Sequence, residues 1–147
     1  MTRQTLIALA ITLALLVPIH AMAQSPIGKW RTFDDTDGKE SGQVIIEDTA
    51  GILSGRITAI ADPQKASLNC NLCTDTRKGQ PILGMTILTG MRQDDDKWNG
   101  GQILDPKTGS VYHCSMKLSD GGAKLVLRGY IGVPLFGRSQ TWLRATP

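Results

Sequence analysis

The cysteines and the histidines are the residues of this sequence whose side chains could do covalent or metal chemistry. The chain of 147 residues has three Cys and two His. His20 lies in an apolar N-terminal stretch, so His113 is the only histidine of the remaining chain. Cys70 and Cys73 form a Cys-x-x-Cys pair, and Cys114 directly follows His113. Such a set can form a disulfide, a redox pair or part of a metal site.

The three uses of the cysteines make different demands. Zinc would need a fourth ligand, which only His113 or a carboxylate could supply. A thioredoxin-like redox pair is expected at a helix start in a βαβ unit, whereas Cys70 and Cys73 lie in the long irregular segment 62–80. Outside the cytoplasm an oxidised bond is the default. We therefore favour a structural disulfide over redox function, and redox function over metal binding.

The expected disulfide joins Cys114 to the segment 62–80, with Cys73 favoured over Cys70 because it lies nearer the next strand. A loop of this length without regular structure needs a tether to offset its entropy. The bond would close a loop of about 45 residues, worth roughly 4 kcal/mol in the chain-entropy account.

His113 and Cys114 are neighbours in an expected strand, so their side chains point to opposite faces. They should not form a thiolate–imidazolium pair, and we expect His113 to face solvent. A Ser-His-Asp triad would have to use His113, and no Gly-x-Ser-x-Gly motif presents a serine. We therefore expect no catalytic residues, no cofactor and no enzyme activity.

Acidic residues gather in two short clusters, Asp34, Asp35 and Asp37, and then 94–96. The first cluster lacks the spacing and terminal Glu of an EF-hand loop. Asp is common in turns because its side chain accepts hydrogen bonds from the turn backbone. Both clusters are expected to be solvated turns rather than metal sites.

Composition and charge set the class of protein. Hydrophobic residues make up 41%, aromatic residues 5% and charged residues 20%, which fits one soluble globular domain. The formal charge of +3 falls to +2 without Arg3. This charge is too small and too scattered to indicate nucleic-acid binding.

The N-terminus has the three parts of a secretory signal peptide. A short region with Arg3 precedes the apolar run 6–17, Pro18 ends it, and Ala21-Met22-Ala23 supplies the small–x–small cleavage pattern. We expect residues 1–23 to be a signal peptide and residues 24–147 to be one exported domain, in the periplasm or outside the cell. No second apolar segment is long enough to span a membrane.

Beyond residue 25, apolar residues alternate with polar ones, and turn residues recur about every ten positions, which indicates an all-β protein. Eight strands are expected, and eight antiparallel strands close a small barrel whose interior is filled by side chains or shared with a small ligand. The expected strands cover residues 28–33, 43–48, 53–60, 82–91, 97–104, 110–118, 123–130 and 138–144.

Two short signatures stand at the ends of this strand pattern. Gly28-Lys29-Trp30 opens the first strand, and Trp142-Leu143-Arg144 closes the last. Lipocalin-like barrels often begin with Gly-x-Trp and end with an Arg that packs across the Trp. The resemblance implies that Trp30 plugs one end of the barrel, with the guanidinium of Arg144 stacked on it and Trp142 beside it.

A fuller resemblance is spread along the chain. Its segments include Gly51-Ile52-Leu53-Ser54-Gly55-Arg56-Ile57, Pro81-Ile82-Leu83-Gly84-Met85, the run 98–112 that opens Trp98-Asn99-Gly100-Gly101, Leu127-Arg128-Gly129-Tyr130-Ile131-Gly132 and Gly137-Arg138-Ser139-Gln140-Thr141-Trp142. Over residues 28–144 the chain resembles the secreted bacterial family called domain of unknown function 2147. The resemblance implies a lipocalin-like β-barrel in the bacterial envelope, and it brings no reaction or ligand.

The first functional hypothesis is an exported lipocalin-like binding protein that carries a small hydrophobic molecule, with segment 62–80 as a lid. The alternatives are an envelope or protein-interaction module without ligand, and a redox factor that uses Cys70 and Cys73. The apolar segment 131–137 is expected to plug one barrel end, with a membrane-contacting tip or a ligand portal as alternatives. The expected interior lining is Tyr112, Met116, Leu83, Met85, Ile87, Leu125 and Leu127.

Overall fold

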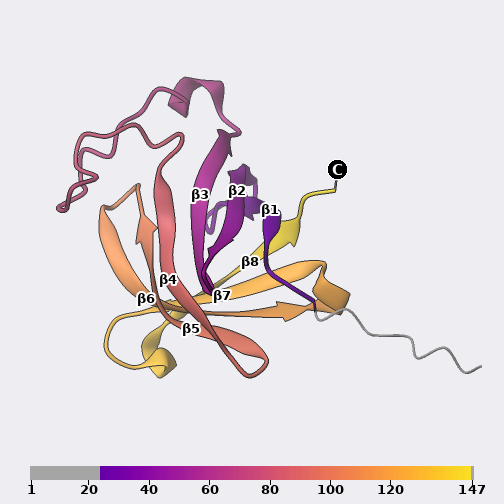
Figure 1. Cartoon of the computed structure of the whole chain (residues 1–147). Helices are drawn as coiled ribbons and strands as arrows, with labels where there is room; N and C mark the ends of the chain where they lie inside the picture. The colour runs from indigo at the N-terminus through magenta and orange to yellow at the C-terminus, as the bar shows by residue number, and fades with distance from the viewer. Residues whose placement is uncertain (1–23, 147) are drawn as a thin grey trace, which may run out of the picture.

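The computed structural model describes residues 24–146, so the predicted signal peptide of residues 1–23 lies outside the described residues. The chain forms a closed antiparallel barrel in which each strand pairs with the next and the last pairs with the first (Figure 1). This confirms the predicted all-β, eight-stranded barrel. The strands are β1 Gly28–Phe33, β2 Glu40–Thr49, β3 Ile52–Ile60, β4 Thr86–Asp94, β5 Lys97–Asp105, β6 Ser110–Ser119, β7 Lys124–Tyr130 and β8 Arg138–Arg144.

Three short 3-10 turns lie in the connections between strands. They are η1 Pro63–Lys65, η2 Asp120–Gly122 and η3 Pro134–Phe136. Within residues 24–146, no helix has the length and apolar character needed to cross a membrane.

The strand that departs most from the sequence pattern is β4, which begins at Thr86 rather than at Ile82. Residues 82–85 form a turn, in which the N–H of Met85 donates to the carbonyl of Ile82 over 3.1 Å. Gly84 has a φ of +88°, a conformation that L side chains rarely adopt. The sequence predicts residues 82–85 as strand because apolar character alone does not distinguish a strand from a buried turn.

Successive antiparallel strands place their connections at alternate ends of the barrel. One end, here called the loop end, carries the connections 34–39, 61–85, 106–109 and 131–137. The other, here called the closed end, carries the tight turns 50–51 and 95–96, the turn η2, and both termini of the barrel. The two long irregular loops therefore lie at the same end.

Large side chains fill the interior between the closed end and the middle of the barrel. A Cβ added to Gly101 would lie 2.2 Å from the Sδ of Met91, so the Met91 side chain already occupies the space that a side chain at position 101 would need. Such close packing is typical of protein interiors. The most deeply buried large side chains are Trp30, Trp142, Ile46, Leu88, Met91, Met116, Leu125 and Val44.

Trp30 closes the barrel floor as predicted. Its side chain is fully buried, and its Nε1 donates to the carbonyl of Pro26 over 2.7 Å. The guanidinium carbon of Arg144 lies 4.3 Å from the centre of the Trp30 ring, and the two residues are register partners between β1 and β8. Trp142 is 2% exposed and is the register partner of Leu125 on the neighbouring strand β7.

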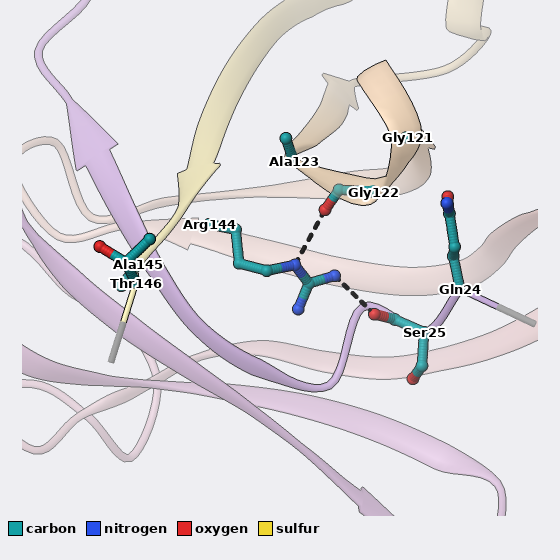
Figure 2. Close-up of a pocket in the computed structure, with 8 residues that line it drawn as sticks. All are labelled: Gln24, Ser25, Gly121, Gly122, Ala123, Arg144, Ala145 and Thr146. Atoms are coloured by element: carbon teal, nitrogen blue, oxygen red, sulfur yellow. Dashed lines mark hydrogen bonds between the residues drawn. The ribbon is translucent and has the colours of Figure 1, made fainter. Parts of the chain in front are cut away.

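The guanidinium of Arg144 also holds the N-terminal segment in place. Its Nε donates to the carbonyl of Gly122 over 2.8 Å, and its Nη2 donates to the carbonyl of Ser25 over 2.8 Å (Figure 2). Its Nη1 donates to the carbonyl of Ile27 over 3.1 Å. One side chain therefore links the first strand, the last strand and η2.

Replacing Trp30 with Ala should lower the free energy of unfolding by about 3–5 kcal/mol, the usual cost of removing a large buried aromatic. The substitution leaves a cavity and removes the donor to the Pro26 carbonyl. Urea unfolding followed by circular dichroism measures the change. The matched control is Lys29→Ala, an exposed neighbour that should change stability by less than about 0.5 kcal/mol. A loss below about 1 kcal/mol for the Trp30 variant would contradict its role as the floor.

Candidate ligand-binding site at the loop end of the barrel

The exposure of the inward-facing side chains changes along the barrel axis. In the half near the closed end, Trp30 and Leu125 are 0% exposed and Met116 is 2% exposed. Near the loop end, Tyr112 is partly exposed, and its register partner Ile103 is partly exposed as well. The interior is thus sealed at the floor and becomes accessible toward the loop end.

Gly129 of β7 lies diagonally across from Tyr112 at this level, because its register partner on β6 is Cys114, the next inward-facing residue. A Cβ added to Gly129 would lie 3.5 Å from the Cβ of Tyr112 and 3.7 Å from the Cγ2 of Ile103, which is ordinary van der Waals contact. No side chain of β7 therefore covers the Tyr112 ring at position 129. Gln140 and Thr32, also partly exposed, supply polar groups on β8 and β1 at the same end.

Two turns are linked across the mouth of the barrel by charged and polar side chains. The ammonium of Lys107, in the β5–β6 turn, forms an ion pair with the carboxylate of Asp34, in the β1–β2 turn. Strands β1 and β5 are four apart in the ring of eight, so this pair joins opposite sides of the mouth. Asp35 accepts from the Nε2 of Gln140 over 2.8 Å. We call the pair Asp34–Lys107 the strap.

The strap stays charged over the physiological pH range. Hydrogen bonds from Lys107 and Thr36 hold the pKa of Asp34 well below its usual range. The hydrogen bond to Asp34 in turn raises the pKa of Lys107. Both charges therefore persist at neutral pH, and the carboxylate of Asp34 is the partner that acid would remove first.

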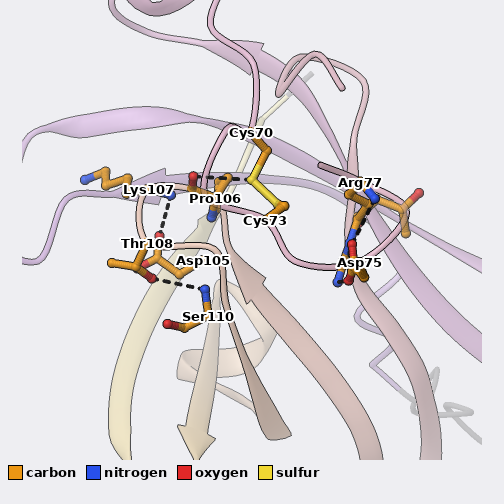
Figure 3. Close-up of a disulfide and its surroundings, with 10 residues drawn as sticks. Cys70, Cys73, Asp75, Arg77, Asp105, Pro106, Lys107, Thr108 and Ser110 are labelled. Carbon is orange, nitrogen blue, oxygen red and sulfur yellow. Dashed lines mark hydrogen bonds and ion pairs between the residues drawn. A yellow bond between two sulfur atoms is a disulfide. The ribbon is translucent and has the colours of Figure 1, made fainter. Parts of the chain in front are cut away.

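The disulfide prediction was wrong. Cys70 is bonded to Cys73, with their Cα atoms 5.4 Å apart (Figure 3). Cys114 is a free, buried thiol. Cys114 lies within β6, opposite Gly101 and Gly129. The loop that carries Cys70 and Cys73, here called the cysteine loop, contacts the β5–β6 turn. Cys114 is five residues along β6 from that turn, a distance of about 16 Å at 3.3 Å per residue. Neither Cys70 nor Cys73 can bridge that distance.

The cysteine loop is held against the β5–β6 turn beside the mouth. The Sγ of Cys70 lies 3.6 Å from the carbonyl oxygen of Pro106. A Cβ added to Gly109 would lie 2.0 Å from the carbonyl oxygen of Leu72, so only glycine permits this approach. Both sulfurs belong to buried residues, with Cys70 0% and Cys73 1% exposed. Burial shields the bond from attack by an external thiolate.

His113 and Cys114 lie on opposite faces of β6, as the alternation predicted. His113 is exposed, and its ring centre lies 5.6 Å from that of Tyr130. Burial raises the pKa of the Cys114 thiol to about 12. The thiol is therefore protonated at neutral pH and has little nucleophilic character.

The acidic clusters lie in turns, as predicted. Asp34 accepts from the backbone N–H of Thr36 over 2.8 Å, and Asp37 accepts from that of Lys39 over 3.0 Å. Among residues 24–146, no group of three or more His, Cys, Asp or Glu side chains could hold a metal ion.

The five principal lining candidates lie in three different environments. Met85, Met116 and Leu125 are buried in the packed core, at 6%, 2% and 0% exposure. Tyr112 alone of the five principal candidates lies at the accessible level of the barrel. Leu83 does not line the interior, because it lies in the turn before β4 with 44% of its surface exposed.

Sequence reasoning missed Gln140, Gly129 and the strap. Gln140 and Gly129 occupy inward-facing positions of two strands that the sequence predicts, so alternation of side chains alone could have placed them on the inner wall of the barrel. Lys107 and Asp34 are 73 residues apart in the sequence, and no local pattern pairs them.

The apolar segment 131–137 is not a plug, which corrects the sequence prediction. Leu135 and Phe136 are 78% and 79% exposed, and Ile131 is 71% exposed. The segment lies outside the barrel because Arg128, on the outer face of β7, donates to the carbonyls of Pro134 and Leu135.

Comparisons with known proteins agree with this barrel. The family described as "Uncharacterized protein conserved in bacteria (DUF2147)" matches residues 28–144. The chain belongs to the DUF2147 family. No curated protein matches the chain. Among solved structures, "Protein HP1028 from the human pathogen Helicobacter pylori belongs to the lipocalin family" is similar, with 19% identity, a TM-score of 0.71 and 82% of each chain covered. This likeness shows that the DUF2147 protein has a lipocalin-like fold.

In the native DUF2147 protein, no thiol should react with iodoacetamide at pH 8, because Cys114 is buried with a pKa of about 12 and the other two cysteines are bonded. Denaturation without reductant should expose one thiol, and reduction should expose two more. Peptide mapping by mass spectrometry identifies the alkylated residue. A Thr49→Cys variant, at the exposed end of β2, provides the reactive control. Recovery of a peptide that joins Cys114 to Cys70 or Cys73 would contradict the pairing.

The strap should make the stability of the DUF2147 protein depend on pH. Because the folded-state pKa of Asp34 is lowered, its contribution is fully present above the unfolded-state pKa of about 3.9 and is lost as the pH falls further. Wild type should therefore exceed Asp34→Asn in stability at pH 7, and the gap should shrink toward pH 2. Urea unfolding at both pH values tests this, with Asp95→Asn, in an exposed turn, as control. An equal gap at both pH values would argue against the strap.

Proposed function

We propose that the protein is an exported binding protein that holds a small hydrophobic molecule at the loop end of the barrel. The observation that carries this proposal is the change in exposure of the inner wall. The wall is buried at Trp30 and Leu125 and partly exposed at Tyr112 and Ile103. A lipocalin-like barrel with one sealed end and one accessible end suits a ligand that enters from the loop end.

We place the small ligand near the mouth. Met116 and Leu125 already fill the lower half, so a bound molecule would rest above them against Tyr112, Ile103 and Gly129. These residues offer mainly apolar contact. Gln140 supplies an amide that could orient a polar group of the ligand, as is usual in such sites.

The strap fits the role of a gate. A ligand that enters the barrel must pass between the β1–β2 and β5–β6 turns, which Asp34 and Lys107 join. The Lys107 side chain is 61% exposed and that of Asp34 is 21% exposed, so salt should weaken this ion pair. A strap of this kind can open without unfolding the strands.

Export is supported by the sequence of residues 1–23, which has the charged, apolar and small-residue parts of a signal peptide. The Cys70–Cys73 disulfide fits an oxidising compartment. N-terminal sequencing of the protein recovered from the periplasm would test cleavage after Ala23.

A substitution that fills the mouth should abolish ligand binding while the barrel remains folded. Gly129→Leu places a side chain against Tyr112, and it should weaken binding of a fluorescent fatty-acid probe, dansyl undecanoic acid, at least about tenfold. The matched control is Val126→Leu, on the same strand at a position that alternates with the buried Leu125 and Leu127, which should leave the affinity unchanged. Circular dichroism checks that both variants are folded.

Native mass spectrometry of the protein purified from the periplasm provides an independent test. A bound apolar molecule whose mass is lost in Gly129→Leu supports the proposal. A bare polypeptide mass, together with no saturable binding of the probe by wild type, would overturn it.

The second candidate is an interaction module without ligand. It is favoured by the packed lower half and by the position of an open groove of about 560 Å³, which lies outside the barrel at the closed end (Figure 2). Ser25, Gly122 and Arg144 contribute to this groove. The donors of Arg144 are already bonded to backbone carbonyls, so the groove presents little free polar chemistry. We therefore place the ligand site at the loop end.

A further inference from the structure

The connection between β7 and β8 carries the most exposed apolar side chains of the described chain. We call residues 131–136 the apolar tip. Ile131, Leu135 and Phe136 are each more than 70% exposed, at 71%, 78% and 79%, and Val133 is 52% exposed. In Figure 1 the tip forms a turn that projects from the barrel wall between β7 and β8. Apolar side chains that are contiguous and exposed mark contact sites.

The backbone of the tip is hydrogen-bonded internally, and its end packs on β7. The N–H of Phe136 donates to the carbonyl of Val133 over 3.2 Å, and the N–H of Gly137 donates to that of Pro134 over 3.1 Å. A Cβ added to Gly137 would lie 2.7 Å from the carbonyl oxygen of Gly129, so the end of the tip packs closely on β7.

Arg128 satisfies two further backbone groups of the tip. Its Nε donates to the carbonyl of Pro134 over 2.6 Å, and its Nη2 donates to that of Leu135 over 3.1 Å. Pro134 itself has no N–H that would need a partner. A segment whose backbone groups are bonded internally can enter an apolar phase at lower cost.

The charged side chains of β7, the tip and β8 are all positive. From residue 121 to residue 147 the sequence has no Asp or Glu. Arg128 and Arg138 flank the tip, and within residues 24–146 neither forms an ion pair. Tyr130, the last residue of β7, adds an aromatic ring with a polar end next to the tip.

We propose that the apolar tip docks the loop end of the barrel onto an anionic lipid bilayer. Leu135 and Phe136 would enter the boundary between headgroups and acyl chains, and the guanidinium of Arg138 would lie at the lipid phosphates. Arg128, whose Nε, Nη1 and Nη2 donate to Pro134, Ser139 and Leu135, would add its positive charge beside them. Tyrosine and arginine are typical of membrane interfaces, and basic residues are attracted to anionic leaflets. We call Arg128 and Arg138 the positive rim of the tip. Apolar side chains that project from the barrel wall beside a positive rim match an anionic bilayer better than they match a flat or grooved protein surface.

This contact would add to the proposed function, because the mouth lies at the same end as the tip. A single short apolar insertion gives weak, reversible membrane binding. A docked barrel could then exchange a hydrophobic molecule with the bilayer without passing it through water. The membrane contact itself depends only on the tip and its charges.

A tryptophan reporter can locate the contact on the molecule. The three native Trp residues are buried, at 0%, 8% and 2% exposure, so Phe136→Trp introduces a tryptophan that is exposed at the tip. The matched reporter is Thr49→Trp, at the exposed end of β2 on the closed end of the barrel. Both variants are expressed and exported as the full chain. They are mixed with vesicles of brominated phosphatidylcholine containing about 30% phosphatidylglycerol, the acidic lipid that the positive rim requires.

The expected result is a blue shift and strong quenching of the Phe136→Trp emission, with little change for Thr49→Trp. Vesicles of phosphatidylcholine alone should bind at least about fivefold more weakly, since they lack the anionic charge. Equal quenching of both reporters, or no quenching of either, would overturn the proposal.

Vesicle flotation of untagged variants tests the two parts of the tip separately. Leu135→Ser combined with Phe136→Ser should weaken binding to anionic vesicles by about tenfold or more, because two apolar side chains no longer enter the bilayer. Arg138→Gln should weaken binding to anionic vesicles by a few-fold and leave the weak binding to neutral vesicles unchanged. Thr49→Ser, at the closed end, is the control and should bind as wild type does.

Size-exclusion chromatography with light scattering examines the competing occupant, a second copy of the chain. A monomer that binds anionic vesicles agrees with the proposal. A dimer that Leu135→Ser with Phe136→Ser converts to monomer, in a protein that does not bind vesicles, would overturn it.

Discussion

The barrel depends on the contact between its first and last strands at Trp30. Arg144 is the register partner of Trp30 on β8 and stacks on its ring at 4.3 Å. The same guanidinium donates to carbonyls of the N-terminal segment and of η2. A closed barrel has no free strand edges, and this closure is completed by one aromatic side chain and one cation on opposite sides of the seam.

Because the floor seals the closed end of the barrel, a molecule from solvent can approach the interior only from the loop end. The floor and the methionines above it are buried, so the proposed ligand contact lies at the level of Tyr112, where the inner wall is partly exposed. The long connections lie at the loop end, opposite the tight turns of the closed end. The strap of Asp34 and Lys107 joins two turns of the mouth, and the apolar tip belongs to another connection at the same end. The proposed ligand and the proposed membrane contact thus meet on one side of the molecule.

The sequence alone determined the number and order of the strands, because alternation of side chains is a local property with a period of two. It also determined the floor, through Gly28, Trp30 and Arg144 at the ends of the pattern. The sequence also predicted that the side chains of His113 and Cys114 lie on opposite faces, because the two residues are neighbours in one strand. The sequence predicts that β4 starts at Ile82, whereas it starts at Thr86, because a run of apolar residues shows no alternation that marks where the strand begins.

Only the tertiary structure decided which side chains meet across long distances in the sequence. Cys114 is separated from the cysteine loop by the length of half a strand, and the bond forms within Cys70–Cys73 instead. Asp34 and Lys107 meet because the ring places β1 opposite β5. The exposure of the apolar tip depends on Arg128 holding its carbonyls outside the barrel. Local patterns fix which face a residue occupies, whereas contacts across the barrel depend on closure, register and loop path together.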